Sequence, residues 1–196
     1  MVGLFRTALA VLAIVALGLQ ASVAYAHSSE VFDPAGDLAT AAPAYSDIVH
    51  AKVTEQVGRD RLYFMIEVAE RIPDTPTKAD GTPQFLAWNW AVDAPVGGAF
   101  DYTVIVRYCS HTIQGPCAGD PWHWESELIG PTGRQVNAFP FAVDGATVKA
   151  SVGLAQLGAA NLAQLDWFTV SRIAPGVSGA PPVDFAPNSG VVSLLR

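Results

Sequence analysis

The sequence has few basic residues and little charge of either sign. Lys and Arg number 11 against 18 Asp and Glu, so the net charge is -7, and charged residues make up only 15% of the chain. Nucleic acids and anionic membranes are bound through clusters of basic side chains, and no such cluster occurs, so we expect neither as a partner. Hydrophobic residues reach 51%, which excludes a disordered chain and predicts a sizeable core.

Enzyme signatures are also missing. The sequence contains no G-x-S-x-G, no H-E-x-x-H and no phosphate-binding glycine loop. A glycosidase needs only two carboxylates, which Glu125 could supply with Glu127 or Asp120, but no apolar pattern around them predicts a pocket. We therefore interpret these acids as surface charges and expect a protein that is not an enzyme.

The N-terminus has the three parts of a secretory signal peptide. A basic start in residues 1–6 precedes an apolar run in residues 8–19, and Ala24-Tyr25-Ala26 matches the small-x-small cleavage pattern. The run is shorter than the ~20 residues of a membrane-spanning helix, so we expect cleavage and no membrane insertion afterwards. The sequence thus predicts a signal peptide over residues 1–26 and one secreted, extracellular domain over residues 27–196.

Cysteine is scarce, with Cys109 and Cys117 as the only two. In an oxidising compartment the pair favours a disulfide around residues 110–116. Chain-entropy arithmetic assigns such a short loop about 2.5 kcal/mol. A metal site would need more Cys or His ligands at fixed spacing, and only His111 lies inside the loop.

Apolar and polar residues alternate with a period of two along most of the chain. Alternation of this kind is typical of half-buried strands, and runs that are apolar on both faces are typical of central strands. Pro140 would place its strand at an edge or a bulge. The expected strands cover residues 49–54, 62–68, 85–92, 100–108, 135–143, 147–154, 166–173 and 191–195.

Turn signals separate these strands, and helix is almost absent. Asp144-Gly145 is a tight hairpin signal. Residues 154–165 are the only helical candidate, and Gly158 and Asn161 interrupt it, so we expect one or two short turns. The pattern as a whole predicts an all-β fold, namely an antiparallel β-sandwich of jelly-roll type.

Short motifs appear in a recognisable order along the mature chain. They are Asp33-Pro34-Ala35-Gly36-Asp37, the stretch 43–53 with Asp47-Ile48, then Leu62-Tyr63-Phe64, Ala87-Trp88, and the closing stretch 184–190. This order resembles exported bacterial β-sandwich domains grouped with family-nine carbohydrate-binding modules and DOMON domains. The resemblance implies a jelly-roll sandwich that is often calcium-stabilised and binds a ligand. One difference is that Asp93-Ala94-Pro95 stands where such domains often have D-T-D.

Acidic residues gather near both ends of the mature chain. Calcium takes about six to eight oxygen ligands from carboxylates, amides and carbonyls. If the first and last strands are neighbours, both groups could bind one Ca²⁺. The alternative is an ordinary type I turn, because Asp, Pro and Gly at positions 33, 34 and 36 fit that turn without an ion. The candidate ligands are Asp33, Asp37, Asp47, Asp184 and Asn188.

Five tryptophans form the second group of interest. Trp88 and Trp90 share a strand face with aliphatic residues, so we expect them in the core, and Trp167 stays unassigned. Trp122 and Trp124 lie two residues apart among polar residues, so their rings could stack on a carbohydrate while His123 and Glu125 bind its hydroxyls. The alternative is that both rings pack under a loop.

Two other functions remain open from the sequence. A structural or adhesive cell-surface domain would bind another protein, and a large flat apolar patch would favour it. A copper protein of the histidine-brace type would use the free amine and imidazole of His27. The second imidazole of such a brace would come from His50, His111 or His123. Against it, Ser28-Ser29-Glu30 suggests a mobile end, and His50 is expected on the solvated face of its strand.

Overall fold

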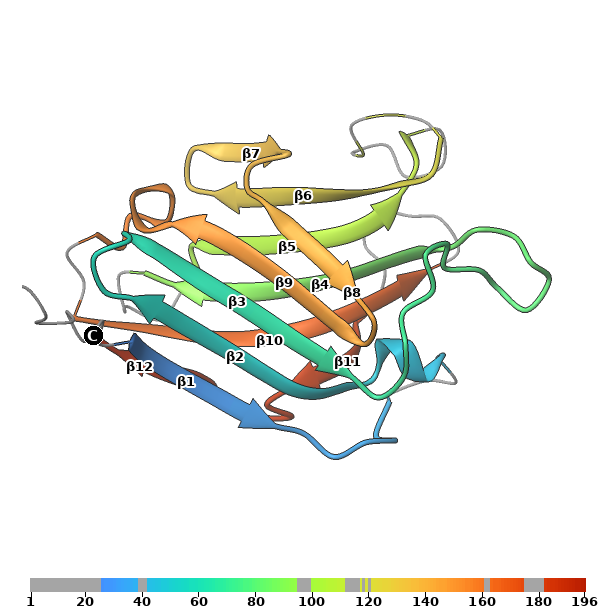
Figure 1. The fold of residues 1–196 in the computed structure, drawn as a ribbon, viewed down its shortest axis with the longest axis horizontal. Helices are drawn as coiled ribbons and strands as arrows, with labels where there is room; N and C mark the ends of the chain where they lie inside the picture. The colour runs from blue at the N-terminus through green and yellow to red at the C-terminus, as the bar shows by residue number, and fades with distance from the viewer. Residues whose placement is uncertain are drawn as a thin grey trace, which may run out of the picture.

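The computed structural model is an all-β protein made of two antiparallel sheets packed face to face (Figure 1). It describes residues 26–38, 42–94, 100–111, 117, 119, 121–160, 163–174 and 182–196. The predicted signal peptide therefore lies outside the described residues, except for Ala26. Within the described part of the chain, no helix is long and apolar enough to cross a membrane. The predicted antiparallel β-sandwich is confirmed, and the finer jelly-roll topology stays a prediction.

The five-stranded sheet has the strand order β1-β2-β3-β9-β8. The alternating patterns of three strands in this sheet match the prediction, with apolar residues buried and polar residues outside. The β8–β9 hairpin turns at Asp144-Gly145 as expected, and Gly145 has a φ of 60°. The strands are β1 (Ala26–Phe32), β2 (Ile48–Gln56), β3 (Arg61–Val68), β9 (Thr147–Gly153) and β8 (Phe141–Asp144).

The seven-stranded sheet has the order β11-β10-β4-β5-β6-β7, and β12 also pairs with β10. Its central strands are covered on the inner face by the first sheet, and several outer side chains are also buried. The strands are β4 (Phe85–Asp93), β5 (Tyr102–Cys109), β6 (His123–Gly130), β7 (Gly133–Val136), β10 (Gln164–Ala174), β11 (Pro182–Ala186) and β12 (Val192–Leu195).

The core lies between the sheets and includes the predicted tryptophans. Trp88, Trp90 and Trp167 are all fully buried, so the expectation for the first two is confirmed and Trp167 joins them. Trp90 packs on Phe64 of the opposite sheet, with 5.7 Å between ring centroids. The Trp167 indole N–H donates to the Ser29 hydroxyl at 2.8 Å, which ties β1 to the core.

The prediction of a single strand over residues 135–143 is wrong. The chain leaves the seven-stranded sheet after β7 and enters the five-stranded sheet as β8. Two residues interrupt the strand at this crossing. Asn137 has a positive φ of 53°, which is not a strand conformation, and Pro140 has no N–H group to donate to a neighbouring strand.

The expectation of one or two short turns within residues 154–165 is met. The described residues there form one 3₁₀ turn, η2 (Leu154–Leu157), which ends at Gly158 with a φ of 62°.

The mobile end predicted at Ser28-Ser29-Glu30 is also wrong. These residues form the middle of β1, which pairs with β2 from Ala26–Gln56 to Phe32–His50. Because β1 is a polar edge strand, its sequence lacks the apolar signal that marks β2 and β3. β1, β11 and β12 lie close together in Figure 1, so the two ends of the described chain meet at one side of the sandwich.

Candidate functional site

The acidic residues from the two ends of the chain converge on one cluster. One carboxylate oxygen from each of Asp33, Asp37 and Asp184 lies within 4.8 Å of the other two. Asp33 and Asp37 follow β1, whereas Asp184 lies on β11 in the other sheet. Asn188 donates through Nδ2 to Asp33 at 3.0 Å and to Asp37 at 2.7 Å.

Asp47 connects this cluster to the short helix η1 (Ala44–Ser46) and to β2. Its Oδ2 accepts from the Gly36 amide at 2.7 Å, so it holds the loop that carries Asp33 and Asp37. Asp184 in turn accepts from the amides of Ile48 and Phe185. All five residues predicted as metal ligands are therefore brought together in space, and we name them the acidic cluster.

Several oxygens of the acidic cluster are buried without enough donors. Asp47 and Asp184 are only 2% and 3% exposed. Among the described residues, Asp33 Oδ2 and Asp47 Oδ1 have no hydrogen-bond partner although both atoms are buried. A buried carboxylate without a partner is costly, and a cation would remove that cost.

The carboxylates of the acidic cluster repel one another. Burial raises the pKa of Asp33 to about 7, and the charges of Asp37, Asp184 and Asp47 add to the increase. Burial also raises the pKa of Asp184 to about 6, against the lowering effect of its two backbone amide donors. The raised pKa values of Asp33 and Asp184 mean that the surroundings described here disfavour the charged forms of both carboxyls, which a bound cation would stabilise.

The donor set of the acidic cluster suits a hard cation. Four carboxylates and one side-chain amide supply oxygen atoms, which is the ligand chemistry that calcium prefers. Asn188 now points its amide nitrogen at Asp33 and Asp37. A half-turn of that amide would present its oxygen to a shared ion instead.

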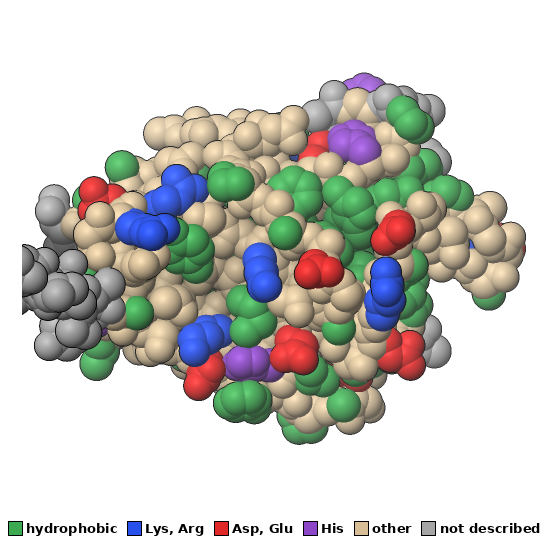
Figure 2. Space-filling view, viewed as in Figure 1, with side chains coloured by type: hydrophobic (Ala, Val, Ile, Leu, Met, Phe, Trp, Pro, Cys, Tyr) green, Lys and Arg blue, Asp and Glu red, His purple; other side chains and the backbone are tan. Residues whose placement is uncertain are grey.

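Trp124, one of the predicted sugar-binding residues, lines a pocket of about 410 Å³ between the sheets. One face of its ring stacks on the buried Trp88, with centroids 5.8 Å apart, and its N–H donates to the Asp74 carbonyl at 3.2 Å. Phe141 of β8 also lines this Trp124 pocket, together with the exposed acids Asp74 and Asp144. Figure 2 shows hydrophobic side chains beside β8 with acidic and basic side chains around them.

Trp122 lies outside the Trp124 pocket. Its ring stacks on Tyr108 at 5.5 Å, and Tyr108 also contacts Trp124 at 5.2 Å. Both tryptophans are half-buried, so each presents part of its ring to solvent. They share a tyrosine neighbour, but only Trp124 belongs to a concave surface.

Glu125 and His123 point to the other face of β6, away from the Trp124 pocket. Glu125 is fully buried and accepts from the Arg107 Nε at 2.7 Å. His123 Nε2 lies 3.3 Å from Glu125 Oε2. Glu127 is buried as well and pairs with Arg107 and Arg134. The interpretation of Glu125 and Glu127 as surface charges is therefore wrong, because β6 turns both toward arginines.

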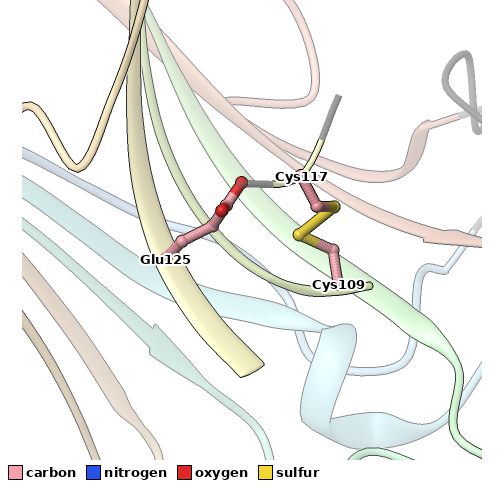
Figure 3. A group of neighbouring side chains, drawn as sticks. All are labelled: Cys109, Cys117 and Glu125. Carbon is pink, nitrogen blue, oxygen red and sulfur yellow. A yellow bond between two sulfur atoms is a disulfide. The ribbon is translucent and has the colours of Figure 1, made fainter. Parts of the chain in front are cut away.

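Cys109 and Cys117 are joined by a disulfide, with 6.1 Å between their Cα atoms. Figure 3 shows the Glu125 carboxylate beside this disulfide. The three residues also form a potential metal-binding group by distance alone. Because the two sulfur atoms are bonded to each other, they do not act as thiolate ligands in this state.

His27 and His50 have acidic partners, whereas His111 Nδ1 lies 3.0 Å from the Cys117 carbonyl. His27 lies 3.4 Å from Glu55, and His50 lies 3.1 Å from Glu30 and stacks on Phe32. His50 lies on the outer face of β2 with Lys52, as expected, although its side chain is only 15% exposed because Phe32 and Glu30 cover it. No group of potential metal ligands found among the described residues includes His27.

Sequence reasoning missed most of the Trp124 pocket. Arg71 and Asp74 lie in the β3–β4 connection, and Phe141 and Asp144 lie on β8. In the sequence, Asp74-Thr75-Pro76 has only a turn signal, and nothing links it to residues almost seventy positions later.

No protein-family model, curated protein or solved structure compared with this chain matches it. The resemblance to family-nine carbohydrate-binding modules and DOMON domains therefore stays a prediction from short motifs. The acidic cluster and the Trp124 pocket are the two features whose geometry points to a function.

Proposed function

We propose that this protein is an exported, calcium-stabilised β-sandwich that binds carbohydrate. The observation that carries the proposal is the acidic cluster. Five oxygen-bearing side chains from both ends of the chain meet there, and two of their buried oxygens lack partners among the described residues. A divalent cation would neutralise this charge and cross-link the loop after β1, the start of β2 and β11.

Asp33, Asp37, Asp47, Asp184 and Asn188 would hold the ion through oxygen atoms. The ion would supply positive charge and would act structurally, because no reactive group lies among these ligands. Calcium fits better than a softer metal, since the cluster contains neither histidine nor cysteine.

The calcium part of the proposal is tested by thermal unfolding of the mature protein in EDTA, Ca²⁺ or Mg²⁺. An ion that binds only the folded state stabilises it by about 4 kcal/mol at a thousandfold excess over Kd. For a domain of this size that corresponds to an increase in Tm of roughly 10 °C. An identical Tm in EDTA and in Ca²⁺ would overturn the calcium proposal.

The Trp124 pocket supports carbohydrate as the ligand. A half-exposed indole offers an apolar surface to the C–H face of a sugar ring, and Phe141 adds a second aromatic side chain. The same pocket is lined by Asp74, Asp144 and Arg71. The two carboxylates can accept hydrogen bonds from sugar hydroxyl groups, and the guanidinium can donate to them. A volume of about 410 Å³ lies within the range of small-ligand sites.

The carbohydrate part is tested with a glycan array, followed by titration of the best oligosaccharide into wild type and Asp144→Asn. Asp144 is exposed and outside the acidic cluster, so this variant is expected to fold normally. We expect it to weaken binding about tenfold, since hydrogen bonds to charged groups contribute roughly 1.5–3 kcal/mol. Binding of no glycan, or unchanged binding by the variant, would contradict the assignment of the Trp124 pocket.

A further inference from the structure

Two acceptor atoms face each other on the outer face of β6, and the proposed function uses neither of them. His123 Nδ1 lies 2.8 Å from the Pro121 carbonyl. Because a carbonyl oxygen only accepts hydrogen bonds, Nδ1 carries the ring proton, and Nε2 of the neutral imidazole carries a lone pair. That lone pair lies 3.3 Å from Glu125 Oε2, which is also an acceptor. A cation between the two atoms, either a proton on the ring or a metal ion, removes this repulsion.

Strand register brings the two cysteines to the same place. Cys109 of β5 lies directly opposite His123 of β6, and Arg107 lies opposite Glu125. Residues that are opposite each other point to the same face of a sheet, so Cys109 and His123 share the outer face with Glu125. One Glu125 carboxylate oxygen and the sulfur atoms of Cys109 and Cys117 lie within 4.8 Å of one another. Figure 3 shows this carboxylate beside the disulfide.

These four side chains are buried to different degrees. Cys109 and Glu125 are fully buried, and Cys117 is only 4% exposed. The His123 side chain, in contrast, is 34% exposed. The imidazole is therefore the member of the group through which ions in solution reach the sulfur atoms and the carboxylate.

The donor atoms of this group suit zinc once the disulfide is reduced. Two thiolates, an imidazole and a carboxylate are the ligand types that tetrahedral zinc takes in proteins. The ligand atoms of such an ion lie about 3.3–3.8 Å apart, because its bonds measure about 2.0–2.3 Å. The two cysteine Cα atoms are 6.1 Å apart, so rotation of the reduced side chains can open the distance between the sulfur atoms to that range.

The ion pair between Glu125 and Arg107 is compatible with metal binding. Arg107 Nε donates to Glu125 Oε1 at 2.7 Å, whereas Oε2 is the oxygen that faces His123. Carboxylates and imidazoles that bind a metal normally keep a second hydrogen bond, which orients them. Arg107 supplies that bond to Glu125, and the Pro121 carbonyl accepts it from His123. A Zn²⁺ ion with two thiolates also adds no net charge to this buried group, so it avoids the cost of burying an unbalanced charge.

We propose that the reduced protein binds one Zn²⁺ through the side chains of Cys109, Cys117, His123 and Glu125, so that a dithiol reductant exchanges the disulfide for a metal ion. In the first step the S–S bond breaks, each cysteine sulfur gains one electron and one proton, and the dithiol is oxidised to its own disulfide. Zinc then displaces the two thiol protons, which pass to solvent. The ion holds Cys117 against β5 and β6 as the disulfide does. This inference does not depend on calcium or on the Trp124 pocket.

The test compares the oxidised mature protein with the protein reduced by a dithiol, which is then removed without oxygen. Both are kept in saturating Ca²⁺ and titrated with Co²⁺, which takes the place of zinc at sulfur and nitrogen ligands. Cobalt bound to thiolates absorbs in the near ultraviolet, whereas cobalt bound only to oxygen ligands does not. We expect this absorption in the reduced protein, its disappearance when Zn²⁺ is added, and none of it in the oxidised protein.

Three histidine variants test the location of the site. His123→Gln should lower the Co²⁺ affinity of the reduced protein at least about tenfold, since even the loss of a group behind a ligand costs that much. His50→Gln is the matched control, because His50 is also a partly buried histidine beside a glutamate but lies in the other sheet, and it should leave the affinity unchanged. His111→Gln should also have no effect, because His111 Nδ1 lies against the Cys117 carbonyl.

If the reduced protein unfolds without metal, the titration is followed by near-ultraviolet circular dichroism, and Zn²⁺ should restore the native signal by binding the folded state. Three results would overturn the proposal: no thiolate absorption in the reduced protein, equal absorption before and after reduction, and equal losses of affinity in His123→Gln and His50→Gln. A loss in His111→Gln without one in His123→Gln would also contradict it. The calcium and glycan experiments do not measure thiolate absorption, so failure of one proposal leaves the others intact.

Discussion

Asn188 and Asp33 lie 155 residues apart in the sequence, and their side chains are joined by a hydrogen bond of 3.0 Å. This bond connects the loop after β1 to the segment after β11, and so it holds the two ends of the described chain together. In the absence of a cation, the amide of Asn188 is the group that holds Asp33 and Asp37 together. Because these carboxylates are held close together, the stability of this side of the sandwich should depend on pH and on metal ions.

The first prediction concerns pH in the absence of metal. The pKa of Asp33 is raised to about 7 and that of Asp184 to about 6, both above the ordinary value of 3.8. The folded state therefore binds more protons than the unfolded state between about pH 4 and 7, and this contribution to stability is lost as pH rises. In EDTA, we expect a higher Tm at pH 5 than at pH 8.

Calcium should reverse the effect of pH, because the ion binds deprotonated carboxylates. The difference in Tm between Ca²⁺ and EDTA should therefore be larger at pH 8 than at pH 5. Asp33→Asn serves as the control and should reduce the pH dependence in EDTA. A Tm in EDTA that rises from pH 5 to pH 8 would contradict the prediction.

The second prediction concerns Asp47, which is buried and accepts from the Gly36 amide. Asp47→Asn keeps the shape of the side chain and removes one negative charge from the acidic cluster. We expect the affinity for Ca²⁺, measured by calorimetry, to fall at least about tenfold, because ligand charge tunes calcium affinity. In EDTA the variant should be no less stable than wild type, since repulsion within the cluster is reduced.

Asp144→Asn is the matched control for Asp47→Asn. It removes the same charge at an exposed position outside the acidic cluster. Calcium affinity should stay at the wild-type value in this variant. Equal losses in the two variants would mean that net charge, rather than the cluster, controls binding.

The third prediction concerns the disulfide. Thiol labelling of unreduced, exported protein should detect no free cysteine, because Cys109 and Cys117 are bonded. Reduction should lower the free energy of unfolding in urea by about 2.5 kcal/mol from loop entropy alone. Two labelled thiols in the native protein would show that the bond does not form in the exported chain.

The fourth prediction separates the two half-buried tryptophans. Trp124→Phe keeps an aromatic ring against Trp88 but shrinks the surface presented to the Trp124 pocket, so glycan binding should weaken about tenfold by loss of stacking. Trp122→Phe should leave glycan binding unchanged, because Trp122 stacks on Tyr108 outside the pocket. The reverse ranking in calorimetric titrations would move the binding site to Trp122.

The sequence by itself determined the fold class and the core strands. In β2, β3 and β9, apolar and polar residues alternate. Successive residues of a strand point to opposite faces, so this alternation predicts which side chains face the core. It also identified Trp88 and Trp90 as core residues by their aliphatic neighbours on one face. The members of the acidic cluster could also be predicted, because acidic residues near the start of the mature chain and an acid and an amide near its end suggested that they share one cation.

The tertiary structure decided which segments meet. The polar edge strand β1 and the charged strand β6 lack the apolar alternation that marks the inner strands, so they are recognised only by their pairing. The change of sheet between β7 and β8 likewise depends on where the chain crosses, which periodicity does not record.

The sites depend on tertiary contacts even more strongly. The Trp124 pocket joins the β3–β4 connection to β8, and the acidic cluster joins the loop after β1 to β11 of the other sheet. Local sequence determines the direction of each side chain along its own strand. Whether two such side chains become neighbours is determined by strand register and sheet packing, because these contacts join residues far apart in the chain.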